Sequence, residues 1–296
     1  MEITKNFEVK IMNAFGEDGR RWLDSLEGTV QLFLQKWELT SEGPVNNLSY
    51  NYVLKVRDLE GIPLILKLGV PNFDTRNEIQ TLQYYNGEGC ARLLKYDLEH
   101  GVMLLEQLVP GTMLSEETDE AQVISNYIKV WKEIRRQAPS EISTPFITRW
   151  FVGLSREEHL NGPIPVEHIQ LAKECLKQIL ETSTVPELLH GDLHHENILF
   201  SEQHGWMAID PKGVIGDSYF DIVSFLVNQL DSKEDPKGIV RFRVDLISEG
   251  LGLNRQRLLR AAVALGTLYA CWGIEDGDPD WEKTYQCVKW FIEFLE

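Results

Sequence analysis

The chain has 296 residues, 43% of them hydrophobic and 25% charged, which is the composition of a globular protein with room for two domains. Its 46 acidic and 29 basic residues give a net charge of −17, which argues against a nucleic-acid footprint and against an anionic membrane surface. The same charge favours a cationic small molecule as partner, while solubility is the simpler explanation.

The first 107 residues predict a small antiparallel sheet with helices. Apolar residues at helical spacing predict a helix over 20–36, and a second helix is expected over 73–85 with Asp74 as its N-cap. Residues 58–61 form a turn sequence between two strands. The expected strands are 37–40, 50–57, 62–68, 91–98 and 102–108.

From about residue 118 the apolar period becomes helical, so residues 108–296 predict a mostly helical second domain. The break is expected near Pro110-Gly111, which interrupts the strand pattern. After a first helical stripe over 123–134, helices are expected at 144–161, 166–181, 217–230, 238–249, 254–271 and 281–295.

Targeting signals are absent from the sequence pattern. The four cysteines show no CxxC spacing, which is typical of reduced thiols in a cytoplasmic protein. The first residues contain no apolar stretch of the kind found in signal peptides, and the apolar run 261–274 is too short to span a bilayer. We therefore expect a cytoplasmic protein; the sequence gives no indication of oligomeric state.

The segment 190–197, HGDLHHEN, is the most informative part of the chain. Asp192 and Asn197 lie five residues apart, and two short apolar runs lead on to Asp210. Catalytic loops of phosphoryl-transfer enzymes have this spacing, with a base, an amide ligand and, one hairpin later, a carboxylate ligand. On this interpretation Asp192 accepts the proton of an attacking hydroxyl, while Asn197 and Asp210 supply the oxygen ligands that Mg²⁺ prefers.

Simpler interpretations of the same segment stay open from the residues alone. An Asp followed by an Asn at this spacing also occurs by chance in a plain turn between strands. His190, His194 and His195 could instead bind zinc, although Gly191 makes a helix there doubtful and no cysteine is near. His195 is better explained as a packed or solvated residue than as a ligand.

A lysine and a glutamate in the first domain complete the predicted site. Lys67 interrupts an otherwise apolar strand, and Glu78 shares an apolar helical stripe with Leu82 and Tyr85. A buried charge needs a partner, so we expect a Lys67–Glu78 ion pair that supports phosphate binding. The alternative is an exposed strand lysine.

Nucleotide contacts are less well defined by the sequence. The loop 41–49 has one glycine and matches no glycine-rich phosphate motif, so phosphate donors would be backbone N–H groups and the side chains of Asn46, Asn47 and Ser49. The backbone at Glu106 and Leu108 could bond to an adenine ring, or it could simply end an edge strand.

Acidic residues elsewhere give weaker signals. Asp221 faces inward by period, and we expect it to brace the catalytic loop rather than to take part in chemistry. The acidic run 275–282 with its tryptophan could bind ammonium or guanidinium groups, or it could be a solvated loop. The cluster 231–235 carries the same two alternatives.

Residues 189–199, LHGDLHHENIL, followed by 209–213, IDPKG, resemble the aminoglycoside phosphotransferases, in the branch of streptomycin 6-phosphotransferases and hydroxyurea-resistance kinases. The resemblance implies an α+β, two-lobed protein-kinase-like fold, with residues 1–107 as the nucleotide-binding lobe and 108–296 as the helical lobe that holds the catalytic loop and the acceptor. It implies ATP and Mg²⁺ as cofactors, Asp192 as the catalytic base, Asn197 and Asp210 as magnesium ligands, and Lys67 on the nucleotide phosphates.

The expected activity is therefore an ATP- and Mg²⁺-dependent O-phosphotransferase acting on a hydroxyl of a small cationic molecule such as streptomycin. Asp210-Pro211-Lys212 stands where protein kinases have D-F-G, and no A-P-E follows, which argues against a protein substrate. The alternatives are a metabolic kinase with a choline-, homoserine- or sugar-like acceptor, and a catalytically inactive nucleotide-binding module.

Overall fold

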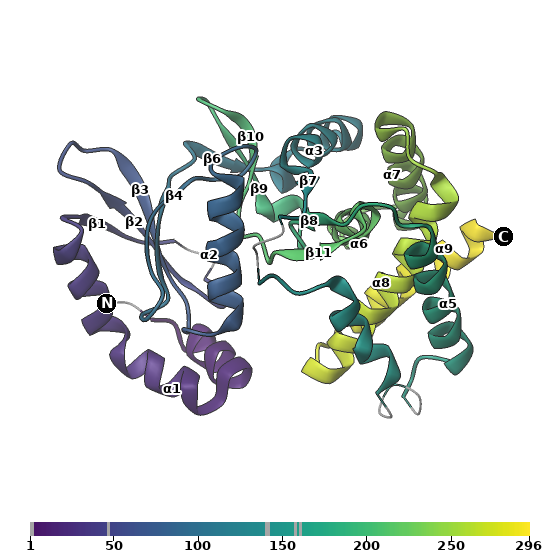
Figure 1. Cartoon of the computed structure of the whole chain (residues 1–296), viewed down its shortest axis with the longest axis horizontal. Coiled ribbons are helices and arrows are strands. Elements are labelled where there is room, and N and C mark those ends of the chain that lie inside the picture. The colour runs from purple at the N-terminus through teal and green to yellow at the C-terminus, as the bar shows by residue number, and fades with distance from the viewer. Residues whose placement is uncertain (1–2, 46–47, 140–142, 157–158, 160–161) are drawn as a thin grey trace. The chain divides into compact units, whose positions relative to one another are not determined.

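The computed structural model describes residues 3–45, 48–139, 143–156, 159 and 162–296. The chain divides into two compact units, Met1–Gly111 and Thr112–Glu296, shown in Figure 1. Pro110 and Gly111, which break the strand pattern in the sequence, are the last residues of the first unit and belong to the short strand β6 (Pro110–Met113).

The first unit is a five-stranded antiparallel sheet with two helices. The strand order is β1-β2-β3-β5-β4, and every neighbouring pair in it is antiparallel. Its elements are α1 (Lys5–Lys36), β1 (Thr40–Pro44), β2 (Tyr52–Arg57), β3 (Pro63–Leu68), α2 (Phe73–Tyr85), β4 (Leu93–Asp97) and β5 (Val102–Glu106).

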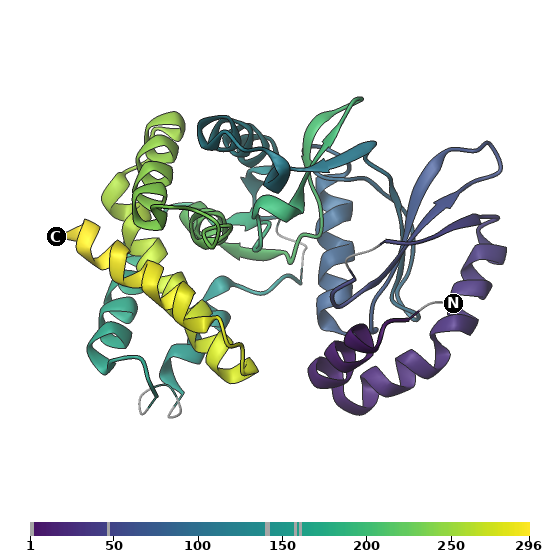
Figure 2. The ribbon, with the colours of Figure 1, turned by 180° about the vertical axis from the view of Figure 1, so that it is seen from behind.

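The two helices of this unit cover opposite faces of the sheet. Leu64, Leu66 and Leu68 on β3 share one hydrophobic core with the buried stripe of α1, which bends at Gly16 (φ 54°). Lys67 alternates with them along the strand and contacts α2 instead. Figures 1 and 2 show α1 and α2 on the two sides of the sheet. Strand alternation thus turns Lys67 away from the apolar core.

The second unit is mostly helical and contains two small antiparallel strand groups. Strands β7 (Arg136–Gln137), β8 (Glu187–Leu189) and β11 (Val214–Gly216) pair in the order β11-β8-β7, and β9 (Ile198–Ser201) forms a hairpin with β10 (Gly205–Ala208). The helices are η1 (Leu114–Glu116), α3 (Glu120–Ile134), η2 (Ile147–Ser155), α5 (Val166–Thr182), η3 (His195–Asn197), η4 (Ser218–Ile222), α6 (Val223–Val227), α7 (Pro236–Leu251), α8 (Arg255–Asp276) and α9 (Trp281–Leu295).

Helix α8 is the central helix of the second unit. It is 22 residues long and apolar enough to pass a length-and-composition test for a membrane span, but 67% of its apolar window is buried inside the protein. It packs mainly against α5 and α9, with further contacts to η2, η4, α6 and α7, and most of its residues from Leu258 to Cys271 are buried. The apolar run that the sequence places at 261–274 is therefore the core of this unit.

Several element boundaries differ from the sequence-based expectation. The strand predicted at 37–40 is wrong, because Trp37 packs on Phe33 and caps α1, so β1 begins only at Thr40. Helix α2 has its predicted bounds, but its N-cap is Asn72, which accepts a hydrogen bond from the Thr75 N–H at 2.9 Å, and not Asp74. The predicted helix 144–161 is a 3-10 helix over 147–155, and residues 157–158 and 160–161 lie outside the described part.

Candidate active site

The HGDLHHEN segment that the sequence singles out lies in the second unit, between β8 and β9. Its turn begins at Gly191, whose φ of 81° is in the left-handed region. A Cβ at this position would lie 3.2 Å from each of three atoms, on Lys212, Trp150 and Val214. Glycine is therefore required by the backbone conformation and by close packing together, and the following residue, Asp192, is placed half-buried at the start of the loop.

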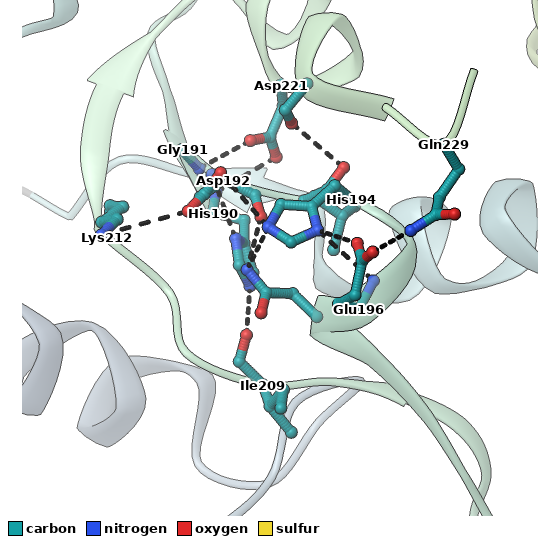
Figure 3. Close-up of polar contacts among 12 residues, drawn as sticks. His190, Gly191, Asp192, His194, Glu196, Ile209, Lys212, Asp221 and Gln229 are labelled. Carbon is teal, nitrogen blue, oxygen red and sulfur yellow. Dashed lines mark hydrogen bonds and ion pairs between the residues drawn. The ribbon is translucent and has the colours of Figure 1, made fainter. Parts of the chain in front are cut away.

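Asp221 holds the backbone of this loop by hydrogen bonds. Its buried carboxylate accepts hydrogen bonds from the backbone N–H groups of His190, at 3.1 Å, and Gly191, at 2.7 Å (Figure 3). Burial raises the pKa of Asp221 to about 7; the two N–H donors lower it, and the charges of Asp192 and Glu187 raise it further. The structure thus gives Asp221 the bracing position that the sequence indicates.

His190 ties the loop to the strand that leads to Asp210. Its Nε2–H donates to the Ile209 carbonyl at 2.8 Å, and its Nδ1 accepts from the Asp192 N–H at 3.2 Å (Figure 3). Burial lowers the pKa of His190 to about 4, although the charges of Asp192 and Asp210 act in the opposite direction. The ring is therefore neutral near pH 7, with its proton on Nε2.

The β9–β10 hairpin returns the chain to the catalytic loop. The Ile209 N–H donates to the Asn197 carbonyl at 2.9 Å, so Asp210 follows directly on a residue bonded to Asn197. Asp210 has a φ of 58°, an uncommon conformation for a residue other than glycine and one that is enriched at functional sites. Asp192, Asn197 and Asp210 thus belong to one hydrogen-bonded group of backbone segments, and all three are half-buried.

A chain of polar contacts fixes the amide of Asn197. Its Nδ2 donates to the Asp192 carbonyl at 2.9 Å and contacts Nε2 of His194 at 3.1 Å. The other ring nitrogen of His194 donates to Glu196 at 2.7 Å, and Gln229 donates to the same carboxylate (Figure 3). Both amide hydrogens of Asn197 are used in this way, which leaves its oxygen as the atom for a ligand.

The pKa values along this chain reflect burial and close charges. Burial alone would raise the pKa of Glu196, but its contact with His194 lowers it to about 2. For His194, burial acts to lower the pKa, while the carboxylates of Glu196 and Asp192 outweigh it and raise the value. The neutral ring is the form that accepts from Asn197, since a proton on Nε2 would oppose the Asn197 Nδ2 donor.

In the first unit, the predicted Lys67–Glu78 ion pair is present. Lys67 Nζ donates to Glu78 Oε1 at 2.6 Å, and the two side chains are 3% and 12% exposed. A lysine on the sheet face opposite the apolar core is thereby held by a carboxylate from α2. The predicted ion pair is therefore confirmed, while the contact of Lys67 with nucleotide phosphate stays a prediction.

For the other predicted nucleotide contacts, the structure gives positions but no arrangement specific to a nucleotide. Ser49 is an exposed residue in a bend, and Asn46 and Asn47 lie outside the described residues. The Glu106 N–H donates to the Arg92 carbonyl, and its carboxylate accepts from the Arg92 N–H at 2.6 Å, so these groups of Glu106 serve the sheet. Leu108 is buried just after β5.

Lys212 is a site residue that sequence reasoning left without a role. Its Nζ lies 4.0 Å from Asp192 Oδ2, and its backbone N–H donates to the His190 carbonyl at 2.8 Å. The side chain is 56% exposed, so the pair is weak by itself. The sequence could have indicated that Lys212 lies near the site, because it stands two residues after Asp210 in the IDPKG run.

The three histidines of the loop do not form a zinc site. Within the described residues, no group of three or more His, Cys, Asp or Glu side chains is arranged to hold a metal ion. His195 is stacked on Phe225 and bonded to the buried Arg243, and burial lowers its pKa to about 3. The oxygens of Asp210 and Asn197 are instead the donor set that suits Mg²⁺, and the orientation of the Asn197 amide fits this assignment.

The acidic clusters considered in the sequence are partly used inside the protein. Glu275 lies on α8 and pairs with Arg156, at 2.5 Å, and with the buried His159, at 2.7 Å. These contacts lower the pKa of Glu275 against the effect of burial, which raises it. Asp231 pairs with Lys283 at 2.8 Å. Neither carboxylate is therefore an unoccupied site for a cation.

Comparison with known proteins identifies the family to which the chain is similar. A model of the aminoglycoside/hydroxyurea antibiotic resistance kinase family matches residues 36–277. Streptomycin 6-kinase of Streptomyces glaucescens is 32% identical, over 94% of this chain and 92% of its own. Hydroxyurea phosphotransferase of Kitasatospora aureofaciens is 30% identical, over 89% and 77%.

Solved structures confirm the predicted fold class. The choline kinase LicA from Streptococcus pneumoniae matches with a TM-score of 0.63 and 15% identity, over 90% of this chain and 99% of its own. The same protein in complex with AMP matches with a TM-score of 0.61. The antiparallel-sheet unit and the helical unit are thus those of a protein-kinase-like fold.

Proposed function

This chain belongs to the family of aminoglycoside and hydroxyurea antibiotic resistance kinases, and we propose that it transfers the γ-phosphoryl group of ATP to a hydroxyl of a small cationic antibiotic such as streptomycin. The chain is accordingly a phosphotransferase. The observation that carries the proposal is the hairpin bond from Ile209 to Asn197, which brings Asp210 back to the Asp192 loop.

Asp192 is the proposed catalytic base. The N–H groups on either side of the turn are held by Asp221 and His190, so the Asp192 side chain starts from a fixed backbone. A carboxylate in this position accepts the proton of the acceptor hydroxyl or orients it for attack. Lys212, 4.0 Å away, adds a positive charge beside it. Positioning and charge stabilisation together supply most of the rate gain in this chemistry.

Asn197 and Asp210 are the proposed ligands of Mg²⁺, and Lys67 the proposed contact to nucleotide phosphate. A bound magnesium ion would neutralise charge on the β- and γ-phosphates. The Asn197 oxygen is presented by the two bonds of its Nδ2, and Glu78 holds the Lys67 Nζ in an ion pair. Ser49 and the backbone at Glu106 and Leu108 stay predictions for the nucleotide site.

The acceptor is proposed to be cationic because of the net charge of −17 and the streptomycin kinases among the relatives. The four cysteines are buried, which fits a protein of a reducing cytoplasm: Cys90, Cys175, Cys271 and Cys287. A kinase for choline-like, homoserine-like or sugar acceptors would retain the same catalytic group and change only the acceptor.

A phosphotransfer assay with ATP, Mg²⁺ and a panel of hydroxyl acceptors tests the proposal. We expect turnover with streptomycin in the wild type. Asp192→Asn should lower kcat by about a thousandfold, because the base is lost, with the KM for ATP within about twofold. Asp245→Asn is the matched control, since Asp245 is an exposed carboxylate paired with Arg255.

Three outcomes would count against the assignment. Near wild-type turnover in Asp192→Asn would overturn the role of the base. Turnover only with choline-like or sugar acceptors would replace the acceptor while keeping the chemistry. ATP binding without transfer to any acceptor would favour an inactive nucleotide-binding module.

A further inference from the structure

Three aromatic side chains of the second unit gather beside the catalytic loop. Trp150 lies on η2, and Tyr269 and Trp272 lie one turn apart on α8. The ring centroids of Trp150 and Trp272 are 5.6 Å apart in an edge-on arrangement, and those of Tyr269 and Trp272 are 5.7 Å apart. The three rings thus form one cluster, which we call the aromatic cluster.

The aromatic cluster reaches the catalytic loop at two points. The Trp150 ring lies 3.2 Å from where a Cβ of Gly191 would stand, immediately before Asp192. The Tyr269 hydroxyl is hydrogen-bonded to Ser224, whose Oγ donates to the Leu193 carbonyl of the loop at 3.1 Å. Burial and the charges of Asp192 and Asp221 raise the pKa of Tyr269 well above its usual value. A molecule that presents a hydroxyl to Asp192 from this side would meet these rings.

Packing of the hydrophobic core does not fully account for the cluster. All three aromatic residues are only half-buried, whereas their α8 neighbours Leu268 and Cys271 are completely covered. Gly153 of η2 lies beside the indole: a Cβ there would be 3.6 Å from Trp272 Nε1, an ordinary van der Waals distance. Three adjacent aromatic residues that keep partial exposure next to a reactive carboxylate are typical of a binding surface.

The electrostatic surroundings favour a positive ligand. Glu275 and Asp276 follow Trp272 on the same stripe of α8, at three and four residues, and the helix ends there with its negative dipole end. Glu275 is paired with Arg156 and His159, while Asp276 is exposed. Aromatic faces attract ammonium and guanidinium groups, and this attraction is strongest for tryptophan.

We propose that Trp150, Tyr269 and Trp272 receive the cationic part of the acceptor, a guanidinium or ammonium group, and so direct a neighbouring hydroxyl to Asp192. This inference rests on the proposed function for its acceptor hydroxyl. It assigns the acceptor contact to rings beside the loop, and it makes charge and aromatic stacking the source of acceptor selection.

The test compares a guanidinium-bearing acceptor with a neutral one. Streptomycin binding is measured by calorimetry, and kcat/KM is measured for streptomycin and for hydroxyurea, in the wild type, Trp272→Leu and Trp272→Phe. Trp37→Leu is the matched control, because Trp37 is a half-buried tryptophan packed on Phe33 in the other unit. Circular dichroism establishes that each variant is folded.

We expect Trp272→Leu to weaken streptomycin binding about tenfold and Trp272→Phe about threefold, since a phenyl ring keeps part of the cation–π attraction. The values for hydroxyurea and the KM for ATP should stay within about twofold. If Trp272→Leu does not fold, Trp272→Phe and Trp150→Phe decide the question by the same ratio of streptomycin to hydroxyurea.

Unchanged streptomycin binding, or an equal loss for both acceptors, would overturn the aromatic assignment even if the wild type is an active kinase. Failure of the proposed function can be told apart from failure of the aromatic assignment. Streptomycin binding that depends on Trp272 without phosphotransfer would retain the aromatic assignment and overturn the proposed function.

Discussion

At the scale of single residues, the site depends on the orientation of one amide. Asn197 could present either its oxygen or its nitrogen to a ligand, and the contacts of Nδ2 to the Asp192 carbonyl and to His194 decide in favour of the oxygen. Glu196 and Gln229 hold His194 in turn. In the proposed magnesium site, these three residues orient the carboxamide that would supply its oxygen to the metal.

This arrangement predicts that His194→Ala weakens metal binding. Because the Asn197 amide loses an acceptor, we expect the half-saturating magnesium concentration and the Mn²⁺ dissociation constant with a non-hydrolysable ATP analogue to rise about tenfold. Electron paramagnetic resonance of Mn²⁺ gives the second value without turnover. His194→Gln should recover most of the affinity, since a glutamine oxygen can accept from Asn197. His204→Ala, at an exposed turn, is the control, and equal Mn²⁺ affinities in all variants would refute the role.

At the scale of elements, some of the architecture follows from sequence periodicity and some does not. Helix α2 and strands β2, β3, β4 and β5 lie close to their expected places, because each has a clear apolar period and polar ends. The expected strand at 37–40 is the cap of α1, and the expected helix 217–230 is a 3-10 turn followed by the short α6, which ends at Val227. Short segments of this kind are set by tertiary contacts that no local period reports.

The site could be predicted to the extent that its chemistry is local. Asp192, Asn197 and Asp210 stand in a compact motif, and the Lys67–Glu78 pair follows from two charges on apolar faces. The Gln229 and Trp150 contacts join residues far apart in the chain, at element ends with no motif of their own. The sequence therefore indicates the candidate catalytic and metal-binding groups, whereas the contacts that orient them are seen only in the structure.

The hydrogen bonds that join Asp221 of η4 to the catalytic loop predict a specific pH dependence of stability. Asp221 has a folded pKa of about 7 against 3.8 for an ordinary aspartate, so its contribution to stability falls as pH rises across that interval. His190 has a folded pKa of about 4 against 6.5, so the unfolded chain binds its extra proton there and its contribution rises with pH. Between pH 4 and 6.5 the two contributions oppose each other.

In Asp221→Asn, the pH-dependent contribution of His190 to stability is no longer offset by that of Asp221. We expect its free energy of unfolding, measured by urea titration from pH 4.5 to 6.5, to rise more steeply with pH than that of the wild type, by up to about 1.4 kcal/mol per pH unit. The charged and titratable groups that act on His190 and Asp221 are the same in the variant and the wild type: Asp192, Glu187, His194 and Asp210. Asp245→Asn, exposed on α7, should run parallel to the wild type. Parallel curves for Asp221→Asn would show that the two protons are not coupled to folding in this way.

At the scale of the whole molecule, the net charge of −17 acts on any cationic acceptor before contact. Long-range attraction raises the local concentration of a positive ligand and is screened within about 10 Å at 0.1 M salt. The exposed acidic residues near the end of α8, Asp276, Asp278 and Asp280, contribute on the side of the aromatic cluster. In the proposed mechanism of acceptor binding, the net charge serves encounter and the aromatic cluster serves recognition.

This predicts a salt effect that depends on acceptor charge. Raising KCl from 20 to 200 mM should lower kcat/KM for streptomycin about fivefold, because screening removes the long-range attraction. The value for hydroxyurea, which is neutral, should change less than about twofold at the same magnesium and ATP concentrations. Equal salt sensitivity for the two acceptors would place the effect on the nucleotide or on the fold rather than on steering.

Asp210 combines a proposed role in metal binding with a left-handed backbone conformation that lowers stability. Glycine adopts this conformation without strain, whereas an aspartate there costs about 1 kcal/mol. Asp210→Gly should therefore raise the melting temperature by a few degrees while abolishing phosphotransfer, as calorimetry beside the acceptor assay would measure. An aspartate at this position therefore lowers the stability of the fold relative to glycine, and its proposed role as a magnesium ligand accounts for its presence.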